Sequence, residues 1–584
     1  MSPATEAVAG AAAGEPPAPD TVTTDNGHPR KWWILAAVSL GMFMALLDVT
    51  IVNIAIPAIM QDLNTTITKV SWVLNAYNLA MAALFLSMGR VADKFGQKLI
   101  FVTGLALFTV FSLLCGLSPS IDWLIAARVG QGIGGAMMMP ISLSILMGAF
   151  PKRQHGTAVG IWGALGTVAA ALGPSIGGVL VTYVSWHWIF FINVPIGIGA
   201  FIFAMAVVPE HRRADAESSV DIGGILLSTG GLFCLVLALT QGNDWGWTSW
   251  RVLLLFGIAV ACYPVFYLWE TRRKSPMFDF RLLRIRSFTS ANTAMMAMGA
   301  ALGASMLLLV IFMVNVMGYS ELRAAMAMTF MPFTALFVAP NAGRLVDRIG
   351  PRFPAAIGLG LFGIGMILLA QLGAQASLWD LAWRLVIMGV GMGLSMPSLA
   401  AAAMGSLPPE FGGVGAGAFS TLRQIGLVLG VAISVSIFTH TVAGEVHTAA
   451  DKAVVYVNSQ TMIPDATKKQ ITGSLEAAAA QGQRGGSEAS RRLGAQALQL
   501  PAPPPGTPPV QAAVIENQQK TLQATIAGFF KDQVAQAFAW PFYAAAIAAL
   551  LGVVPALLTG RRLGEHEGHE TMDRGQRAVA TAGR

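Results

Sequence analysis

The sequence predicts an all-α integral membrane protein with fourteen membrane-spanning helices, arranged as two six-helix pseudo-repeats plus two inserted helices. Of its 584 residues, 54% are hydrophobic and 11% are charged, whereas a soluble globular chain carries about 25% charged residues. Fourteen apolar segments are long enough to cross a bilayer as helices, which takes about 20 residues each. The third observation is an internal repeat.

The apolar segments give the expected spans in order: 32–58, 70–89, 99–118, 123–148, 156–182, 188–208, 222–241, 251–269, 288–316, 324–343, 354–373, 380–406, 412–439 and 533–560. The corresponding division of the chain is a disordered cytoplasmic tail (1–30), an N-terminal six-helix bundle (31–210), two inserted linker helices (211–275), C-terminal bundle helices 9–13 (276–440), an extracytoplasmic loop (441–532), the last membrane-spanning helix (533–560) and a cytoplasmic tail (561–584).

Loops rich in lysine and arginine alternate with loops that contain neither. The basic segments lie at 90–98, 151–155, 209–215, 270–286, 343–352 and 561–562, and the segments without Lys or Arg lie at 118–120, 185–188, 243–250 and 317–320. Positively charged short loops stay in the cytoplasm. We therefore expect a multi-pass protein of the cell membrane with both termini cytoplasmic, and a lipid bilayer as its surroundings.

The internal repeat divides the chain into halves. GRVADKFGQK at 89–98 reappears as GRLVDRIGPR at 343–352, an offset of 254 residues, and Gly156 matches Gly413 at a slightly longer offset. Helices 1–6 therefore correspond to helices 9–14. Two six-helix halves with a binding site at their interface are the architecture of transporters that rock between inward-open and outward-open states.

A single carboxylate, Asp48, interrupts the first apolar segment within LLDVTIVNIAIP (46–57). An ionised carboxylate at mid-bilayer costs about 2.5–3.5 kcal/mol, so a chain that keeps one normally uses it. It can carry a proton, bind a cation or pair with a buried base such as Arg128 or Arg423. We expect Asp48 and Arg128 to couple transport to protons; snorkelling of Arg128 to the outer surface is the alternative.

Other polar or aromatic side chains at membrane depth form a tentative substrate-binding set: Asn53, Trp72, Asn75, Asn78, Gln131 and Arg423. They could line a cavity, and they could equally form hydrogen bonds between helices. Arg423 falls where the repeat gives Gly166. It could select anions, pair with a carboxylate or reach cytoplasmic headgroups.

Two further motifs have a physical reading of their own. In the loop at 89–98 the glycines permit a tight turn, and Asp93 is expected to cap the following helix and to pair with Arg90 or Lys98. In the fifth helix, Pro174 removes a backbone hydrogen bond and is expected to bend the chain. The glycines beside it should let another helix pack closely; they are Gly173, Gly177 and Gly178.

Five stretches together carry a family resemblance: LLDVTIVNIAIP (46–57), GRVADKFGQK (89–98), RVGQGIGGA (128–136), GALGTVAAALGPSIGG (163–178) and WHWIFFINVPIG (186–197). In this order and spacing they resemble the major facilitator superfamily, in its fourteen-helix drug:proton antiporter branch (QacA/EmrB-like). The resemblance covers 32–440 and 533–560. Two residues depart from the family pattern: His187 stands where an arginine is usual, and Gln97 stands where a basic residue is usual.

The resemblance implies the major facilitator fold and assigns roles to its motifs. It implies a cytoplasmic gate formed by Gly89, Arg90, Asp93, Gly96, Lys98, Asp347 and Arg348. It also implies that the bend at Gly173, Pro174, Gly177 and Gly178 belongs to an antiporter and not to an uptake system.

We therefore expect a secondary active multidrug exporter that exchanges protons for amphipathic cationic or neutral compounds by alternating access. The alternative is a dedicated exporter of an endogenous metabolite such as an antibiotic, siderophore or lipid. A membrane enzyme or a receptor would need clustered catalytic residues or a functional outer loop, and neither a Walker loop nor an HExxH motif occurs. We expect no cofactor, no metal and no nucleic acid, with the proton gradient as the energy source. An extracytoplasmic partner could dock on 441–532.

Overall fold

A computed structural model of the chain describes residues 27–210, 221–273, 276–408, 411–460, 465, 468–469, 471–476 and 509–560. The predicted terminal tails (1–30 for the most part, and 561–584) lie outside the described residues. Within the described ranges the regular structure is helical, and fourteen stretches are long and apolar enough to cross a membrane. The predicted number and type of elements is confirmed.

The helices of the N-terminal half are α1 (Lys31–Asp62), α2 (Ile67–Phe95), α3 (Gln97–Gly116), α4 (Ile121–Ala149), α5 (His155–Tyr183), α6 (Trp188–Phe191) and α7 (Asn193–Val207). The inserted helices are α8 (Ile222–Trp245) and α9 (Trp250–Thr271). The C-terminal half contains α10 (Arg286–Asn315), α11 (Glu321–Met328), α12 (Phe330–Ile349), α13 (Arg352–Ala370), α14 (Leu378–Gly405), α15 (Gly412–Ser459), α17 (Pro509–Ala537), α18 (Ala539–Leu551) and α19 (Val553–Leu557).

Helix starts at the end of the bundle away from the basic loops share one local signal. A serine or threonine side chain accepts a hydrogen bond from the third residue of the helix, which satisfies an otherwise free backbone N–H. These N-caps are Thr66, Ser120, Ser249, Ser320 and Ser377. The polar loops of this end thus fix where the membrane helices begin.

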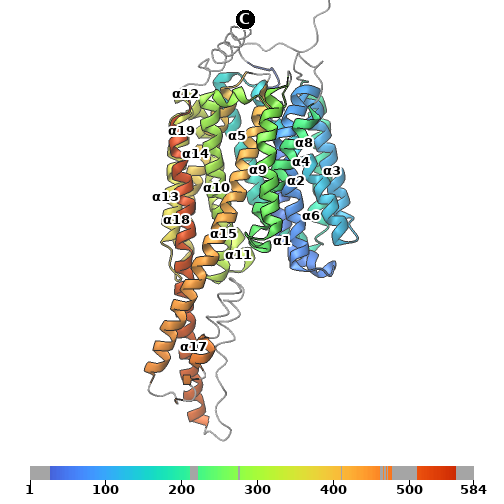
Figure 1. The fold of residues 1–584 in the computed structure, drawn as a ribbon. Helices are drawn as coiled ribbons and strands as arrows, with labels where there is room; N and C mark the ends of the chain where they lie inside the picture. Colours follow the sequence, from blue (N-terminus) through green and yellow to red (C-terminus); the bar gives the residue numbers. More distant parts are fainter. Residues whose placement is uncertain are drawn as a thin grey trace, which may run out of the picture.

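Two pairs of helices join the halves. Helix α5 packs along α12, and α15 packs along α2. The inserted helix α8 lies over the second of these contacts, since it packs on both α2 and α15. The hydroxyl groups of Ser87 and Thr229 lie 2.8 Å apart and link α2 to α8. In Figure 1 the two halves stand side by side as one bundle of roughly parallel helices.

Helix α15 continues beyond its predicted end at 439 and runs to Ser459. Figure 1 shows this extension leaving the bundle together with α17. The extension remains helical because small and apolar residues keep helical spacing. Its Ala453 and Val457 pack in a separate hydrophobic cluster with Ile471, Leu475, Leu522 and Ile526. The predicted loop therefore contains a helical hairpin in its described parts.

Candidate functional site

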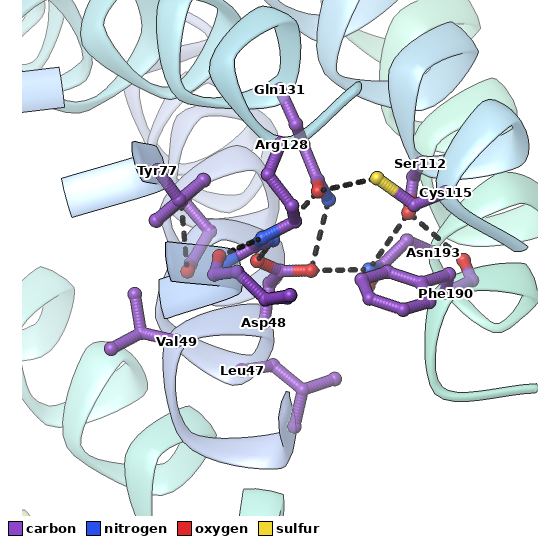
Figure 2. A network of polar contacts seen from close by, with 12 residues as sticks. Leu47, Asp48, Val49, Tyr77, Ser112, Cys115, Arg128, Gln131, Phe190 and Asn193 are labelled. Atoms are coloured by element: carbon purple, nitrogen blue, oxygen red, sulfur yellow. Dashed lines mark hydrogen bonds and ion pairs between the residues drawn. The ribbon is translucent and has the colours of Figure 1, made fainter. Parts of the chain in front are cut away.

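A buried ion pair joins the first and fourth helices. Asp48 of α1 and Arg128 of α4 are completely buried, and Arg128 Nη1 lies 2.5 Å from Asp48 Oδ2. Gln131 donates from Nε2 to Asp48 Oδ1 over 2.9 Å and accepts from Arg128 Nη1 over 2.7 Å. The three side chains form a closed ring of hydrogen bonds (Figure 2). The two predicted proton-coupling residues therefore lie together, and Gln131, predicted for substrate, belongs to the same ring.

Protein surrounds the Arg128 side chain on all sides. Its Nε donates to the carbonyl oxygen of Val73 over 2.9 Å, and its guanidinium lies 4.1 Å from the centre of the Tyr77 ring. A cation over an aromatic face is attracted by the electrons of the ring. Its Nη2 has no hydrogen-bond partner among the described residues. Arg128 therefore does not snorkel to the outer surface.

A second layer of polar groups supports the ion pair from α3 and α7. Asn193 donates from Nδ2 to Asp48 Oδ1 and to Ser112 Oγ, each over 3.2 Å. The Cys115 thiol lies 3.6 Å from the Gln131 carbonyl oxygen and donates to it. The sequence-based set missed these three residues. The signal for Asn193 was available, because it is the one amide side chain in the apolar helix α7.

The network suits an ionised Asp48. The carboxylate accepts hydrogen bonds from Arg128, Gln131 and Asn193, and charge-assisted bonds of this kind are roughly twice as strong as neutral ones. All four side chains have no exposed surface. Asp48 is therefore closed off from water in this conformation.

Helix α5 approaches α1 directly after Asp48. A Cβ atom on Gly177 would lie 2.9 Å from Ile51 Cγ1, and one on Gly173 would overlap the Thr50 hydroxyl. Helix α5 continues through Pro174 as a single helix. Gly178, the last glycine of the motif, is partly accessible. The predicted close contact is thus found, and its partner is the α1 segment beside the ion pair.

A latch fastens α2 to the start of α15. Asp93 accepts hydrogen bonds from the backbone N–H groups of Gly413 and Val414, both over 2.8 Å. The helices touch at Gly89, where a Cβ atom would lie 2.8 Å from the Gly413 carbonyl carbon. The prediction that Asp93 caps the following helix is wrong: it caps α15, in the other half, because the free N–H groups of that helix start are within its reach.

The repeat builds the same latch a second time. Asp347 of α12 accepts from the backbone N–H groups of Gly156 and Thr157 over 2.8 and 2.9 Å, and from the Thr157 hydroxyl over 2.5 Å. Gly343 and Gly156 make the matching backbone contact. Each half therefore caps a helix start of the other half with an aspartate. Both contacts lie at the end of the bundle that carries the basic loops.

The other residues predicted for the gate differ in their contacts. Gly96 has a φ of +115° between α2 and α3, which favours glycine. Lys98 Nζ donates to the Met205 carbonyl over 2.8 Å, so it does not pair with Asp93. Arg90 lies close enough to Asp93 to act on it electrostatically. Arg348 is exposed.

The two departures from the family pattern are explained locally. Gln97 donates to Asp93 Oδ1 over 3.2 Å and to Ser144 Oγ over 2.8 Å, so an amide here positions the latch carboxylate. His187 stacks on Trp186 with ring centres 3.7 Å apart. Burial lowers the pKa of His187, so this position carries no charge at neutral pH.

The residues predicted from the sequence to bind substrate do not form one cluster. Asn53 is exposed and donates to Val49 of its own helix over 3.2 Å. Trp72 packs beside Val236 and Val428, at the contact of α2 with α8 and α15. Three of the set stay partly accessible with no hydrogen bond among the described residues, and they are Asn75, Asn78 and Arg423.

Comparisons with known proteins agree with this arrangement. The family model "Major Facilitator Superfamily" matches residues 38–431. The tetracenomycin C resistance and export protein of Streptomyces glaucescens is 33% identical over 406 residues, 69% of this chain and 75% of the relative. The methylenomycin A resistance protein of Bacillus subtilis is 35% identical over 407 residues, 69% and 86% of the two chains.

The multidrug transporter protein MdtP of Bacillus subtilis is 31% identical over 456 residues, 78% of this chain and 83% of the relative. Among solved structures, the human organic anion transporter MFSD10 matches with a TM-score of 0.54 at 15% identity, covering 70% of this chain and 94% of that chain. This last likeness concerns the fold alone. With fourteen spanning helices, two repeated halves and a family match over most of its length, the chain belongs to the major facilitator superfamily, a family of membrane transporters and not of enzymes.

Proposed function

We propose that the protein exports amphipathic small molecules across the cell membrane in exchange for protons. The observation that carries the proposal is the sealed Asp48–Arg128 pair. Ionisable residues inside a membrane domain are rare and mark ion or proton pathways. The relatives named for drug resistance and export support the direction and the substrate type.

The latches supply the conformational part of the proposal. With Asp93 and Asp347 both engaged, the halves are fastened at the basic-loop end. The alternation of basic loops favours the cytoplasm for this end and for both termini. Opening of the latches would expose the interface of the halves to the cytoplasm. The α15–α17 hairpin would then lie outside the cell, as the candidate contact for an extracytoplasmic partner.

The proton would act at Asp48. In the latched state the carboxylate is paired with Arg128. When the halves rock, separation of this pair would let Asp48 take a proton from one side and release it to the other. Each inward proton driven by about 100 mV supplies about 2.3 kcal/mol, which corresponds to about fiftyfold accumulation of substrate.

Sealed vesicles with a pH-sensitive dye inside test the proposal. Addition of exported compounds to vesicles of the wild-type protein should move protons in the direction opposite to the compound. The Asp48→Asn variant should bind the compounds without proton movement, because an amide of the same size cannot carry a proton. Proton movement that survives in Asp48→Asn protein of normal abundance would assign the coupling to another residue.

A further inference from the structure

Arg423 is an unpaired cation near the middle of the membrane. It lies 11 residues into α15, which corresponds to about 17 Å of helix and about half of a bilayer's hydrocarbon core. No described residue forms an ion pair or a hydrogen bond with its guanidinium. The side chain is partly accessible. Helix α15 packs against α2, α4, α8 and α10, so we assign the accessible part of Arg423 to the interior of the bundle.

The repeat fixes the depth of Arg423 relative to Asp48. Gly173 of α5 packs against the Thr50 side chain of α1, and its repeat counterpart Gly430 of α15 packs against the Ala300 backbone of α10. These contacts are equivalent in the two halves. Position 300 of the second half thus corresponds to position 50 of the first, an offset of 250 residues between α1 and α10.

By this offset, Arg423 lies at the depth of the ion pair but in the other half. The Arg423 backbone carbonyl touches α10 at Gly299, which corresponds to Val49, the residue after Asp48. The counterpart of Asp48 itself is Met298, which is apolar and 1% exposed. The second half therefore has an arginine where the first half has a glycine, and its counterpart of Asp48 carries no carboxylate.

Amide side chains from two helices lie at the same level. Helices α2 and α15 are antiparallel and touch at Gly89 and Gly413. Asn78 lies eleven residues before Gly89 on α2, and Gln424 lies eleven residues after Gly413 on α15. One turn further along α2 is Asn75. None of these three amides makes a hydrogen bond among the described residues.

We propose that Arg423, with the amides Asn75, Asn78 and Gln424 at about the same level of the bundle, binds an acidic group of the exported compound. The substrates are then organic anions, such as carboxylates, enolates and phenolates, and not permanent cations. A charge left unpaired at this depth is costly, and a guanidinium matches two carboxylate oxygens with parallel hydrogen bonds. The amides add donors for the same oxygens. The sequence alone favoured cationic or neutral substrates; the proposal rests on the proposed export function and changes the charge of its substrate.

Three bicyclic aromatic compounds that differ in charge test the proposal: 2-naphthoate, 2-naphthamide and trimethyl(2-naphthyl)ammonium. Calorimetry on the full chain in lipid nanodiscs measures the binding of each. We expect wild-type protein to bind the naphthoate about tenfold to a hundredfold more tightly than the amide, the range for a hydrogen bond to a charged group. Arg423→Gln should remove this preference and Arg423→Lys should keep part of it. Arg384→Gln is the matched control and should change nothing, because Arg384 already donates to backbone carbonyls.

Absence of binding to wild-type protein, equal binding of the three compounds, or an unchanged preference in Arg423→Gln would overturn the proposal. The thermal midpoint of each Arg423 variant should stay near wild type, since Arg423 has no partner to lose among the described residues. Proton movement in vesicles separates this proposal from the export function. Proton-coupled transport of the ammonium compound without anion preference refutes the role of Arg423 alone, whereas anion binding without proton movement refutes proton coupling alone.

Discussion

Removing the two partners of the Asp48–Arg128 pair one at a time should have unequal effects on stability. In Asp48→Asn the guanidinium stays ionised and buried, with the Val73 and Gln131 oxygens and the Tyr77 ring as its remaining partners. Loss of one partner of a buried pair typically costs about 3–5 kcal/mol. Arginine cannot escape this cost, because it does not lose its proton in proteins.

Arg128→Gln should cost less, about 1–3 kcal/mol, the range for a lost hydrogen-bond partner. The stranded Asp48 can take up a proton, and Gln131 and Asn193 remain beside it. For the same reason this variant should be more stable at pH 5 than at pH 8, whereas the cost in Asp48→Asn should not change with pH. The double variant removes both charges and should recover part of the loss, since neighbouring sites are not additive.

The assay is unfolding of purified protein in one detergent at both pH values, with membrane abundance measured beside it. The expected order of stability is wild type, double variant, Arg128→Gln and Asp48→Asn. Equal stability of Asp48→Asn and wild type would refute the reasoning, because it would mean that the pair is not closed in the dominant state. Additive losses in the double variant would mean that the two side chains do not interact.

Three further predictions concern the two latches, the topology and His187. Asp93→Asn and Asp347→Asn should each lower vesicle transport about tenfold with near-normal abundance, because each weakens two charge-assisted hydrogen bonds from backbone N–H groups of the other half. Gly89→Leu should abolish transport, because its side chain has no room at Gly413. Cysteines introduced at 10 and 575 should be protected from an impermeant thiol reagent in intact cells while one at 480 reacts, and equal labelling of 480 and 575 would contradict fourteen spans. Burial lowers the pKa of His187, so its contribution to folding stability is fully present above pH about 6.5 and is lost as the pH falls below that value. His187→Gln should remove this pH-dependent contribution from the profile of thermal unfolding.

The helices and the repeat were predictable because they depend on local composition. A run of about 20 apolar residues must become a helix in lipid. The polar residues that end each run are visible in the sequence. The end of α15 at Ser459 was not predictable in this way. Beyond the membrane its helix depends on packing against α17, 50 or more residues later in the chain, which composition does not reveal.

The centre of the site was predictable and its surroundings were not. Asp48 and Arg128 attracted attention because charges in apolar segments are rare. Their pairing, and the roles of Asn193 and Tyr77, depend on which faces of α1, α2, α4 and α7 meet. The partner of Asp93 shows the same limit: the nearest helix start in the chain was the wrong one, because the fold brings Gly413 to it from 320 residues away.

Each latch is connected to one of the two charged sites through a single helix. Asp93 holds the first turn of α15, and Arg423 lies 10 residues further along that helix. Asp347 holds the start of α5, whose Gly173 packs against α1 two residues from Asp48. Packed helices move as stiff units. Opening the first latch would therefore shift the proposed anion site, and opening the second would shift the proposed proton site. One rocking movement between the halves would then act on the substrate in one half and on the proton in the other.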